Sequence, residues 1–152
     1  MAHTYSIGVD IGGTNTDIGL VREDGKIVAR HNIPTNKYFD IEVYLKDIVE
    51  HVKAMMKENE VETIDGIGIC APNGNTYNCT FSGATNLNFK GEFNVQEIVN
   101  KYMDVKVVVS NDANAAAFGE MIYGGGKGMK HLIMFTLGTG VGTGIIVDGK
   151  LL

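Results

Sequence analysis

The chain has 152 residues, which is enough for one domain with a hydrophobic core, or for one domain and the beginning of another. Hydrophobic residues make up 44% of the chain and charged residues 20%, as in ordinary globular proteins. The formal net charge is −5 without a run of basic residues, and no apolar stretch is long enough to span a bilayer. We therefore expect neither a nucleic acid nor a membrane as partner.

Neither the cysteines nor the histidines are arranged as a metal site. Cys70 and Cys79 lack the spacing of zinc ligands, and the four histidines are scattered along the chain. We expect reduced thiols and no bound zinc. A strand begins at Tyr5, close to the N-terminus, so we expect no signal peptide. The expected location is therefore the cytoplasm.

The N-terminal part of the chain predicts an antiparallel meander, a helix and a further strand. The run 23–26 has the composition of a hairpin turn between two of these strands. Between Ile41 and Met56 apolar residues recur at steps of three and four, which indicates an amphipathic helix with Asp40 as its N-cap. The expected strands are 5–10, 16–21, 26–32 and 64–70.

The segment from Pro72 to Asn94 is polar and without periodicity, so we expect a long loop there. Strands that lead into crossover helices predict an α/β fold whose mixed sheet is flanked by helices. The glycine cluster that begins at Gly124 predicts a boundary between a domain of residues 1–123 and the first strands of a second domain, 124–152. The remaining expected elements are a helix from Val95, a strand at 105–110, a helix at 113–123, and strands at 131–137, 144–147 and from 150 onward.

The first of two glycine motifs closes the opening strand. Asp10 is followed by Ile11, Gly12, Gly13 and Thr14, an order that allows a tight turn with backbone N–H groups pointing into the bend. These donors and the Thr14 hydroxyl are suited to phosphate oxygens, and Asp10 is suited to orienting a hydrated Mg²⁺. An ordinary hairpin turn with glycines at positive φ is the alternative.

The second motif has glycine at every second position from Gly138 to Gly144, with Thr139 and Thr143 among them. It lacks the Gly-Lys-Ser/Thr ending of a Walker loop, and a strand rather than a helix follows, which excludes a dinucleotide fingerprint. A glycine-rich hairpin at a sheet corner is one interpretation. The presence of the first motif favours the other, a second phosphate loop.

A carboxylate lies between the two motifs. Asp112 follows a buried strand and precedes a helix, and ligands of open α/β sheets bind beyond the carboxyl ends of the strands. There a carboxylate can accept the proton of an attacking alcohol. Aspartate is also among the preferred N-cap residues of helices, so a cap role for Asp112 is the alternative from the residues alone.

Together these motifs resemble the ROK family of sugar kinases and sugar-responsive repressors. The resemblance covers the whole chain and matches the N-terminal portion of a glucokinase-like member. It implies the actin-like, hexokinase-like ATPase fold, related to ribonuclease H, and transfer of phosphate from ATP to a hexose, with the glucose 6-OH as the expected acceptor. The motifs that carry it are residues 10–15, residues 111–117 with Gly119 and Glu120, and residues 137–144.

The resemblance also implies roles for individual residues. Asp112 would be the catalytic base that deprotonates the sugar hydroxyl, and Asn111 would hydrogen-bond the sugar. Asn73, Gly74 and Thr85 lie where family members contact sugar. The implied ATP and Mg²⁺ contacts are Asp10, Gly12, Gly13, Thr14, Gly138, Thr139 and Gly140.

Two further family motifs, a Glu-x-Gly-His sugar motif and a cysteine-rich zinc motif, do not occur in this chain. We therefore expect a fragment that is nearly inactive alone, and whose strands from His131 onward pair with a second copy in a homodimer. The strand at Tyr5 leaves no room for the DNA-binding region of the repressors. The alternative from another functional class is a non-enzymatic module that senses sugar or nucleotide, and the presence of Asp112 argues against it. A third possibility is an unrelated ATPase of the same fold, and the Asn-Asp-Ala-Asn motif argues against that.

Overall fold

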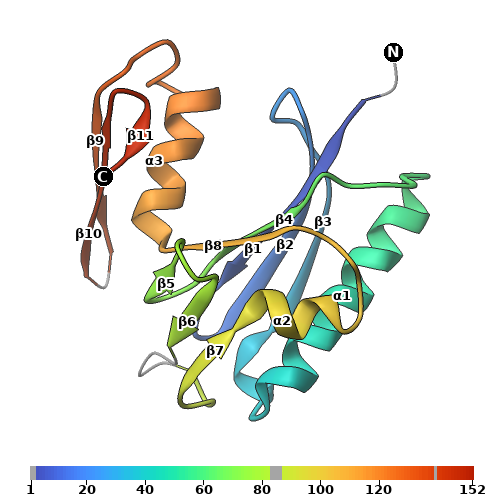
Figure 1. The fold of residues 1–152 in the computed structure, drawn as a ribbon. Coiled ribbons are helices and arrows are strands. Elements are labelled where there is room, and N and C mark those ends of the chain that lie inside the picture. Colours follow the sequence, from blue (N-terminus) through green and yellow to red (C-terminus); the bar gives the residue numbers. More distant parts are fainter. Residues whose placement is uncertain (1–2, 83–86, 139) are drawn as a thin grey trace. The chain divides into compact units, whose positions relative to one another are not determined.

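The computed structural model describes residues 3–82, 87–138 and 140–152, and these form two compact units (Figure 1). The first unit ends at Ser110 and the second begins at Asn111. This division assigns the helix after Asn111 to the second unit, whereas the glycine cluster predicted a boundary at Gly124. The boundary at Gly124 stays a proposal about the domains of a longer protein.

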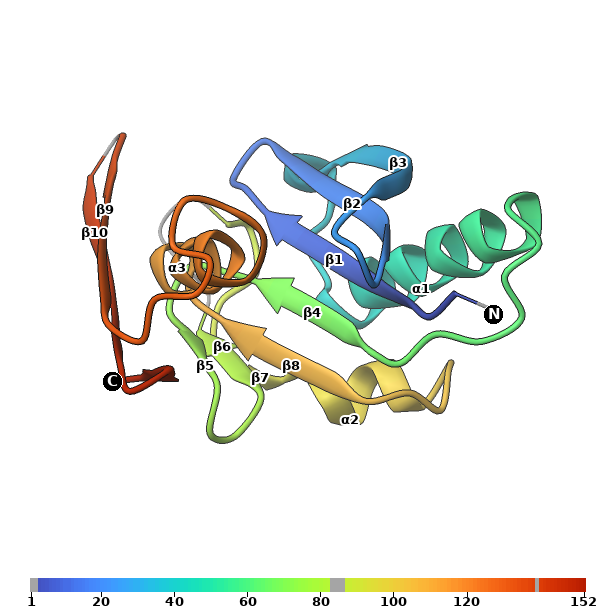
Figure 2. The same ribbon diagram turned by 90° about the horizontal axis from the view of Figure 1, so that it is seen from above.

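A five-stranded mixed sheet forms the centre of the first unit (Figure 2). The strand order is β3-β2-β1-β4-β8, with antiparallel pairing within the β1-β2-β3 meander and parallel pairing of β4 with β1 and β8. The mixed α/β sheet expected from the sequence is confirmed. The strands are β1 Tyr5–Ile11, β2 Asn15–Arg22, β3 Ile27–Pro34, β4 Ile67–Cys70 and β8 Val107–Ser110.

Two capped helices share one hydrophobic core with this sheet. The helix α1 (Ile41–Glu58) follows Asp40, whose carboxylate accepts two backbone N–H groups of the first turn. The shorter α2 (Val95–Asn100) is capped by Asn94, and the 3₁₀ helix η1 (Thr35–Lys37) joins β3 to α1. The shared core includes Ile7, Val9, Ile18, Leu20, Leu45, Ile48, Val52, Ile69, Val99 and Val109.

The segment expected to be a long loop contains a small antiparallel sheet, so that expectation is wrong. The ring of the fully buried Phe81 lies 6.1 Å from that of Phe89 and 5.9 Å from that of Phe93, measured between centroids. Strands this short have no readable period, and aromatic packing between separate parts of the segment holds them together. The sheet has the order β5-β6-β7, with β5 Gly74–Asn75, β6 Thr80–Ser82 and β7 Glu92–Asn94.

The second unit consists of one helix against a three-stranded antiparallel sheet of order β11-β10-β9. The buried residues Ala113 and Ala117 face this sheet from the helix. The second strand begins at Val141 rather than at Gly144, because Gly142 already pairs with Thr136 in register. The elements are α3 Asp112–Tyr123, β9 Leu132–Leu137, β10 Val141–Val147 and β11 Lys150–Leu151.

Among the helices of the described ranges, none has the length and apolar character needed to cross a bilayer.

Candidate functional site

The carboxyl ends of three parallel strands meet at one edge of the first sheet. Asp10 of β1 is in register with Cys70 of β4, which is in register with Ser110 of β8. The first glycine turn follows β1, and the turn with Asn73 and Gly74 follows β4. The structure therefore brings two of the predicted groups to the sheet edge where ligands of such folds bind.

Asp10 lines an open hollow of about 380 Å³. This hollow lies on the face of the sheet opposite to the face that carries the buried side chains of β1. Asp17 of β2 lies opposite Asp10 in the antiparallel register, and Arg30 of β3 also lines the hollow. Carboxylates placed opposite each other on one sheet face can bind a cation together. Asp17 also accepts a hydrogen bond from the side-chain amide of Asn32 at 2.8 Å. Sequence reasoning missed Asp17 and Arg30; strand alternation in the predicted meander was the signal that could have found them.

The first glycine motif forms a tight β1–β2 turn. The N–H of Gly12 donates to the carbonyl of Asn15 at 3.0 Å, and a Cβ on Gly12 would lie 2.8 Å from that same oxygen. Glycine at position 12 is therefore required by the turn itself. Among the described residues the N–H groups of Gly13 and Thr14 have no acceptor, so they are the donors that this turn can offer to a phosphate.

The turn after β4 packs directly on the end of β8. The N–H of Ala71 donates to the carbonyl of Ser110 at 3.0 Å, and a Cβ on Gly74 would lie only 2.3 Å from that oxygen. Glycine at position 74 thus permits a close approach of two backbones, which is a structural reason independent of any sugar contact. Asn73 is exposed and has a positive φ of 57°. Thr85, the third predicted sugar residue of this region, lies outside the described residues.

The start of α3 separates the roles of two neighbouring polar residues. The Oδ1 atom of Asn111 accepts the N–H of Asn114 at 2.8 Å, so Asn111 is the N-cap. Within the described ranges the amide nitrogen of the Asn111 side chain has no acceptor, so it can act as a donor. Asp112 occupies the first turn with an exposed carboxylate, and no hydrogen bond or ion pair engages it within the described residues. Capping therefore does not account for an aspartate at position 112.

The second glycine motif has two parts. Gly138 and Gly140 form the tip between β9 and β10, and Gly142 and Gly144 within β10 form the seam with α3. At the tip, the N–H of Gly138 donates to the carbonyl of Gly140 at 2.9 Å, and a Cβ on either glycine would meet no atom within 4 Å. Neither tip glycine is therefore required by packing against the described residues, and the space beside both is open. Thr139 lies outside the described residues.

In the seam, glycines of β10 let α3 approach the strand. A Cβ on Gly142 would lie 2.5 Å from the Thr136 hydroxyl and 3.0 Å from the Ala113 methyl. A Cβ on Gly144 would lie 2.4 Å from the Ala113 carbonyl oxygen and 2.6 Å from the Ala117 methyl. This glycine–alanine packing joins the first turn of α3, where Asp112 lies, to the strand that leaves the tip.

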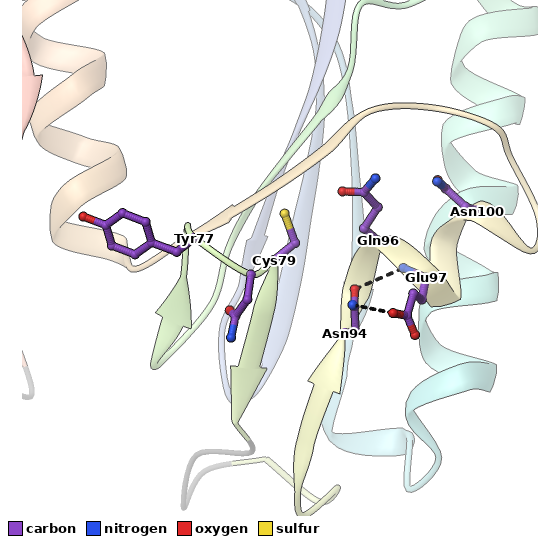
Figure 3. A pocket seen from close by; sticks show the side chains of 7 residues that line it. Tyr77, Cys79, Asn94, Gln96, Glu97 and Asn100 are labelled. Atoms are coloured by element: carbon purple, nitrogen blue, oxygen red, sulfur yellow. Dashed lines mark hydrogen bonds between the residues drawn. The ribbon is translucent and has the colours of Figure 1, made fainter.

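A polar pocket of about 460 Å³ lies beside α2 in the first unit (Figure 3). None of its lining residues was predicted to be functional. Asn94 and Glu97 hydrogen-bond each other at the start of α2, as the dashed lines in Figure 3 show. These two polar groups are therefore engaged in capping the helix. The lining residues are Tyr77, Asn78, Cys79, Asn94, Gln96, Glu97 and Asn100.

Comparison with known proteins places this arrangement in a family. The model of the ROK family matches residues 6–152. The chain is 41% identical over 146 residues to a glucokinase of Streptomyces coelicolor, covering 96% of this chain and 44% of that protein. It is 29% identical over 149 residues to a xylose repressor of Bacillus spizizenii, covering 97% of this chain and 38% of that protein.

A solved structure agrees with these sequence matches. The ROK family glucokinase from Streptomyces griseus, in complex with glucose and AMPPNP, matches with a TM-score of 0.79 and 35% identity over 97% of this chain and 46% of its own. The chain thus spans less than half the length of these relatives. The expected actin-like, hexokinase-like fold class is confirmed. By sequence and by fold, this chain belongs to the ROK family.

Proposed function

We propose that this chain is the N-terminal part of a ROK-type sugar kinase, whose complete form transfers the γ-phosphate of ATP to a hexose hydroxyl. The observation that carries the proposal is Asp112, an exposed carboxylate that is engaged in neither capping nor an ion pair among the described residues. The similarity to glucokinases favours glucose as the hexose and its 6-OH as the acceptor.

The residues have separate roles in this reaction. Asp112 accepts the proton of the sugar hydroxyl as its oxygen attacks phosphorus. The side-chain amide of Asn111 and the exposed Asn73 hold sugar hydroxyls, and Gly74 is a further sugar contact. Thr85, outside the described residues, stays a predicted sugar contact. Positioning and charge stabilisation supply most of the rate acceleration in such transfers.

The nucleotide contacts fit the geometry of both turns. Among the described residues the N–H groups of Gly13 and Thr14, next to Gly12, have no acceptor, and the tip glycines Gly138 and Gly140 border open space, so these groups are suited to phosphate oxygens. Thr139 stays a predicted phosphate contact. Asp10, with Asp17 opposite, fits a hydrated Mg²⁺ that neutralises phosphate charge. The ion itself supplies charge neutralisation when bound.

The test compares two variants of the complete reading frame to which this chain belongs. Asp112→Asn should lower sugar-dependent ADP release at least 100-fold, because general-base catalysis contributes about 10²–10⁴-fold. Its affinity for AMPPNP should stay near that of the wild type. Asp104→Asn is the matched control, since Asp104 is exposed and lies outside the proposed site. Wild-type turnover of Asp112→Asn would refute the assignment of the base.

A second candidate is a sugar- or nucleotide-sensing module without transfer, which the similarity to a xylose repressor favours. The same assay separates the two. Sugar binding, followed by calorimetry, without any ADP release would establish the sensor. Sugar-dependent ADP release would establish the kinase.

We also propose that the 152-residue chain alone has little activity, because closure of two domains excludes water and completes kinase sites of this kind. Sugar-dependent ADP release by this chain at ordinary kinase rates, about 1–100 s⁻¹, would contradict this. The cytoplasmic location stays a prediction.

Self-association is a proposal about the second unit. Ile133, Phe135 and Leu137 of β9 are 61%, 64% and 81% exposed, and β9 is the outer strand of its described sheet. Exposed apolar strand edges pair with other strands. Light scattering should therefore show a dimer whose fraction rises with concentration, and a monomer at high concentration would contradict pairing.

A further inference from the structure

Three buried hydroxyl groups lie behind the first glycine turn. Thr16 and Thr35 are 0% and 1% exposed, and Tyr44 of α1 is 0% exposed. The Oγ1 atom of Thr16 lies 2.7 Å from the Oγ1 atom of Thr35 and 2.5 Å from the phenol oxygen of Tyr44. The cluster therefore connects β2, η1 and α1 through side-chain hydrogen bonds.

Such a cluster is costly unless every member is paired. A hydroxyl moved from water into an apolar interior without a partner costs about 1–3 kcal/mol in mutational data. Here each hydroxyl has a partner, and burial raises the pKa of Tyr44 to about 12, although the hydrogen bonds to Thr16 and Thr35 act in the opposite direction. The phenol therefore keeps its proton at neutral pH and is able to donate it to the cluster.

The cluster is attached to the C-terminal half of the turn. Thr16 directly follows Asn15, whose carbonyl accepts the N–H of Gly12 at 3.0 Å. The backbone N–H of Thr35 donates to the carbonyl of Thr14 at 2.8 Å. The two threonines that share a hydroxyl contact thus also hold the C-terminal half of the turn through the backbone.

We propose that Thr16, Thr35 and Tyr44 form a positioning cluster that holds the turn at residues 12–15 in the geometry that binds phosphate. The cluster contacts no phosphate itself. Tyr44 anchors the two threonines to α1, the longest helix of the first unit. The part of the inference that concerns phosphate rests on the proposed function, whereas the part that concerns the order of the turn does not.

The first test uses amide hydrogen exchange in the 152-residue chain, measured by NMR. Thr35→Val keeps the shape of the side chain and removes the hydroxyl, whereas Thr35→Ser keeps the hydroxyl and removes a methyl group. The amides of Gly12 and position 35 should exchange about five- to tenfold faster in the valine variant, as expected for one lost buried hydrogen bond. They should stay near wild type in the serine variant. The opposite order, with serine worse than valine, would show that the site is only packed and would overturn the proposal.

Tyr44→Phe provides a second route to the same answer, because it removes one hydroxyl and keeps the ring. Its matched control is Tyr102→Phe, which removes a phenol that donates to Glu42 of α1 at 2.9 Å, outside the cluster. Faster exchange at Gly12 in Tyr44→Phe and not in the control supports the cluster. Equal exchange in both variants overturns it.

The affinity for Mg²⁺·AMPPNP, measured by titration calorimetry, separates this inference from the proposed function. If the wild-type chain binds and Thr35→Val binds about tenfold more weakly, with Thr35→Ser near wild type, the cluster positions a phosphate turn. Unchanged affinity in the valine variant would overturn that role. If the wild-type chain does not bind, the proposed nucleotide site fails in this chain, and the exchange rates alone decide whether the cluster orders the turn.

Discussion

A methyl group at position 144 would collide with α3. The added Cβ of Gly144→Ala would lie 2.4 Å from the carbonyl oxygen of Ala113 and 2.6 Å from the Cβ of Ala117, where ordinary contact begins at 3.4 Å. The difference, 3.4 − 2.4 Å, means that helix and strand must separate by about 1 Å. Overpacking of this kind typically costs about 1–3 kcal/mol.

The displaced helix carries the proposed base. Because α3 begins at Asp112, one residue before Ala113, a shift of the first turn moves the carboxylate with it. A misplacement of about 1 Å can lower a catalysed rate about 100-fold. We therefore expect Gly144→Ala to speed amide exchange throughout α3 in this chain, and to lower turnover of the complete enzyme by about that factor.

Gly138→Ala is the matched control for stability. A Cβ at position 138 meets no atom within 4 Å, and the residue does not have a positive φ. Its unfolding free energy in urea should stay within about 0.5 kcal/mol of the wild type. Nucleotide affinity should nevertheless fall, because the methyl group would stand at the tip proposed to receive phosphate.

The two variants therefore have opposite expected profiles. Gly144→Ala with wild-type exchange in α3 would refute the packing argument for the seam. Gly138→Ala with unchanged AMPPNP affinity, in a wild type that binds AMPPNP, would refute the ligand argument for the tip.

Three further predictions concern Gly74, Glu23 and Tyr44. Gly74→Ala places a Cβ 2.3 Å from the carbonyl oxygen of Ser110 and should lower the unfolding free energy by about 1–3 kcal/mol in urea; wild-type stability would refute that close approach. Hydrogen bonds from His3 and Thr4 lower the pKa of Glu23 from 4.5 to about 2, so its contribution to stability is present above pH 4.5 and is lost as the pH falls toward 2. An NMR titration of Glu23 with a midpoint near 4.5 would contradict this. Burial raises the pKa of Tyr44 from 10.0 to about 12, so its contribution is present below pH 10 and is lost as the pH rises toward 12. Tyr44→Phe should remove that part of the alkaline loss, as followed by circular dichroism; an unchanged alkaline profile would contradict it.

Local patterns predicted the long elements of this fold well. The helix expected over 41–56 is present as Ile41–Glu58, and the N-cap role of Asp40 is confirmed, because helical periodicity and capping depend on neighbours in sequence. The small sheet of β5, β6 and β7 was missed, because Phe81 and Phe93 interact across an intervening segment. Two strands begin later than expected, at Ile67 and Val107, since strand ends depend on the partner strand.

The sequence predicted the chemistry of the candidate site only in part. Sequence alone left Asp112 divided between a helix cap and a base, and the structure removes the first role because Asn111 supplies the cap. The sequence could not single out Tyr44, because a buried tyrosine in an amphipathic helix has the pattern of a core residue. Its hydroxyl contact to Thr16 exists only after β2 and α1 have packed together.

The sequence by itself determined the class of the protein, because glycine turns, cap residues and apolar periods express short-range rules of backbone geometry. The family assignment came from the resemblance of three sequence motifs to those of ROK proteins, and the family model over residues 6–152 confirms it. Only the tertiary structure decided which glycine does what. Gly142 and Gly144 lie against α3, where a larger side chain would collide with neighbouring atoms. Gly138 and Gly140 border open space. That difference depends on what packs against each Cα from elsewhere in the chain, which no local pattern encodes.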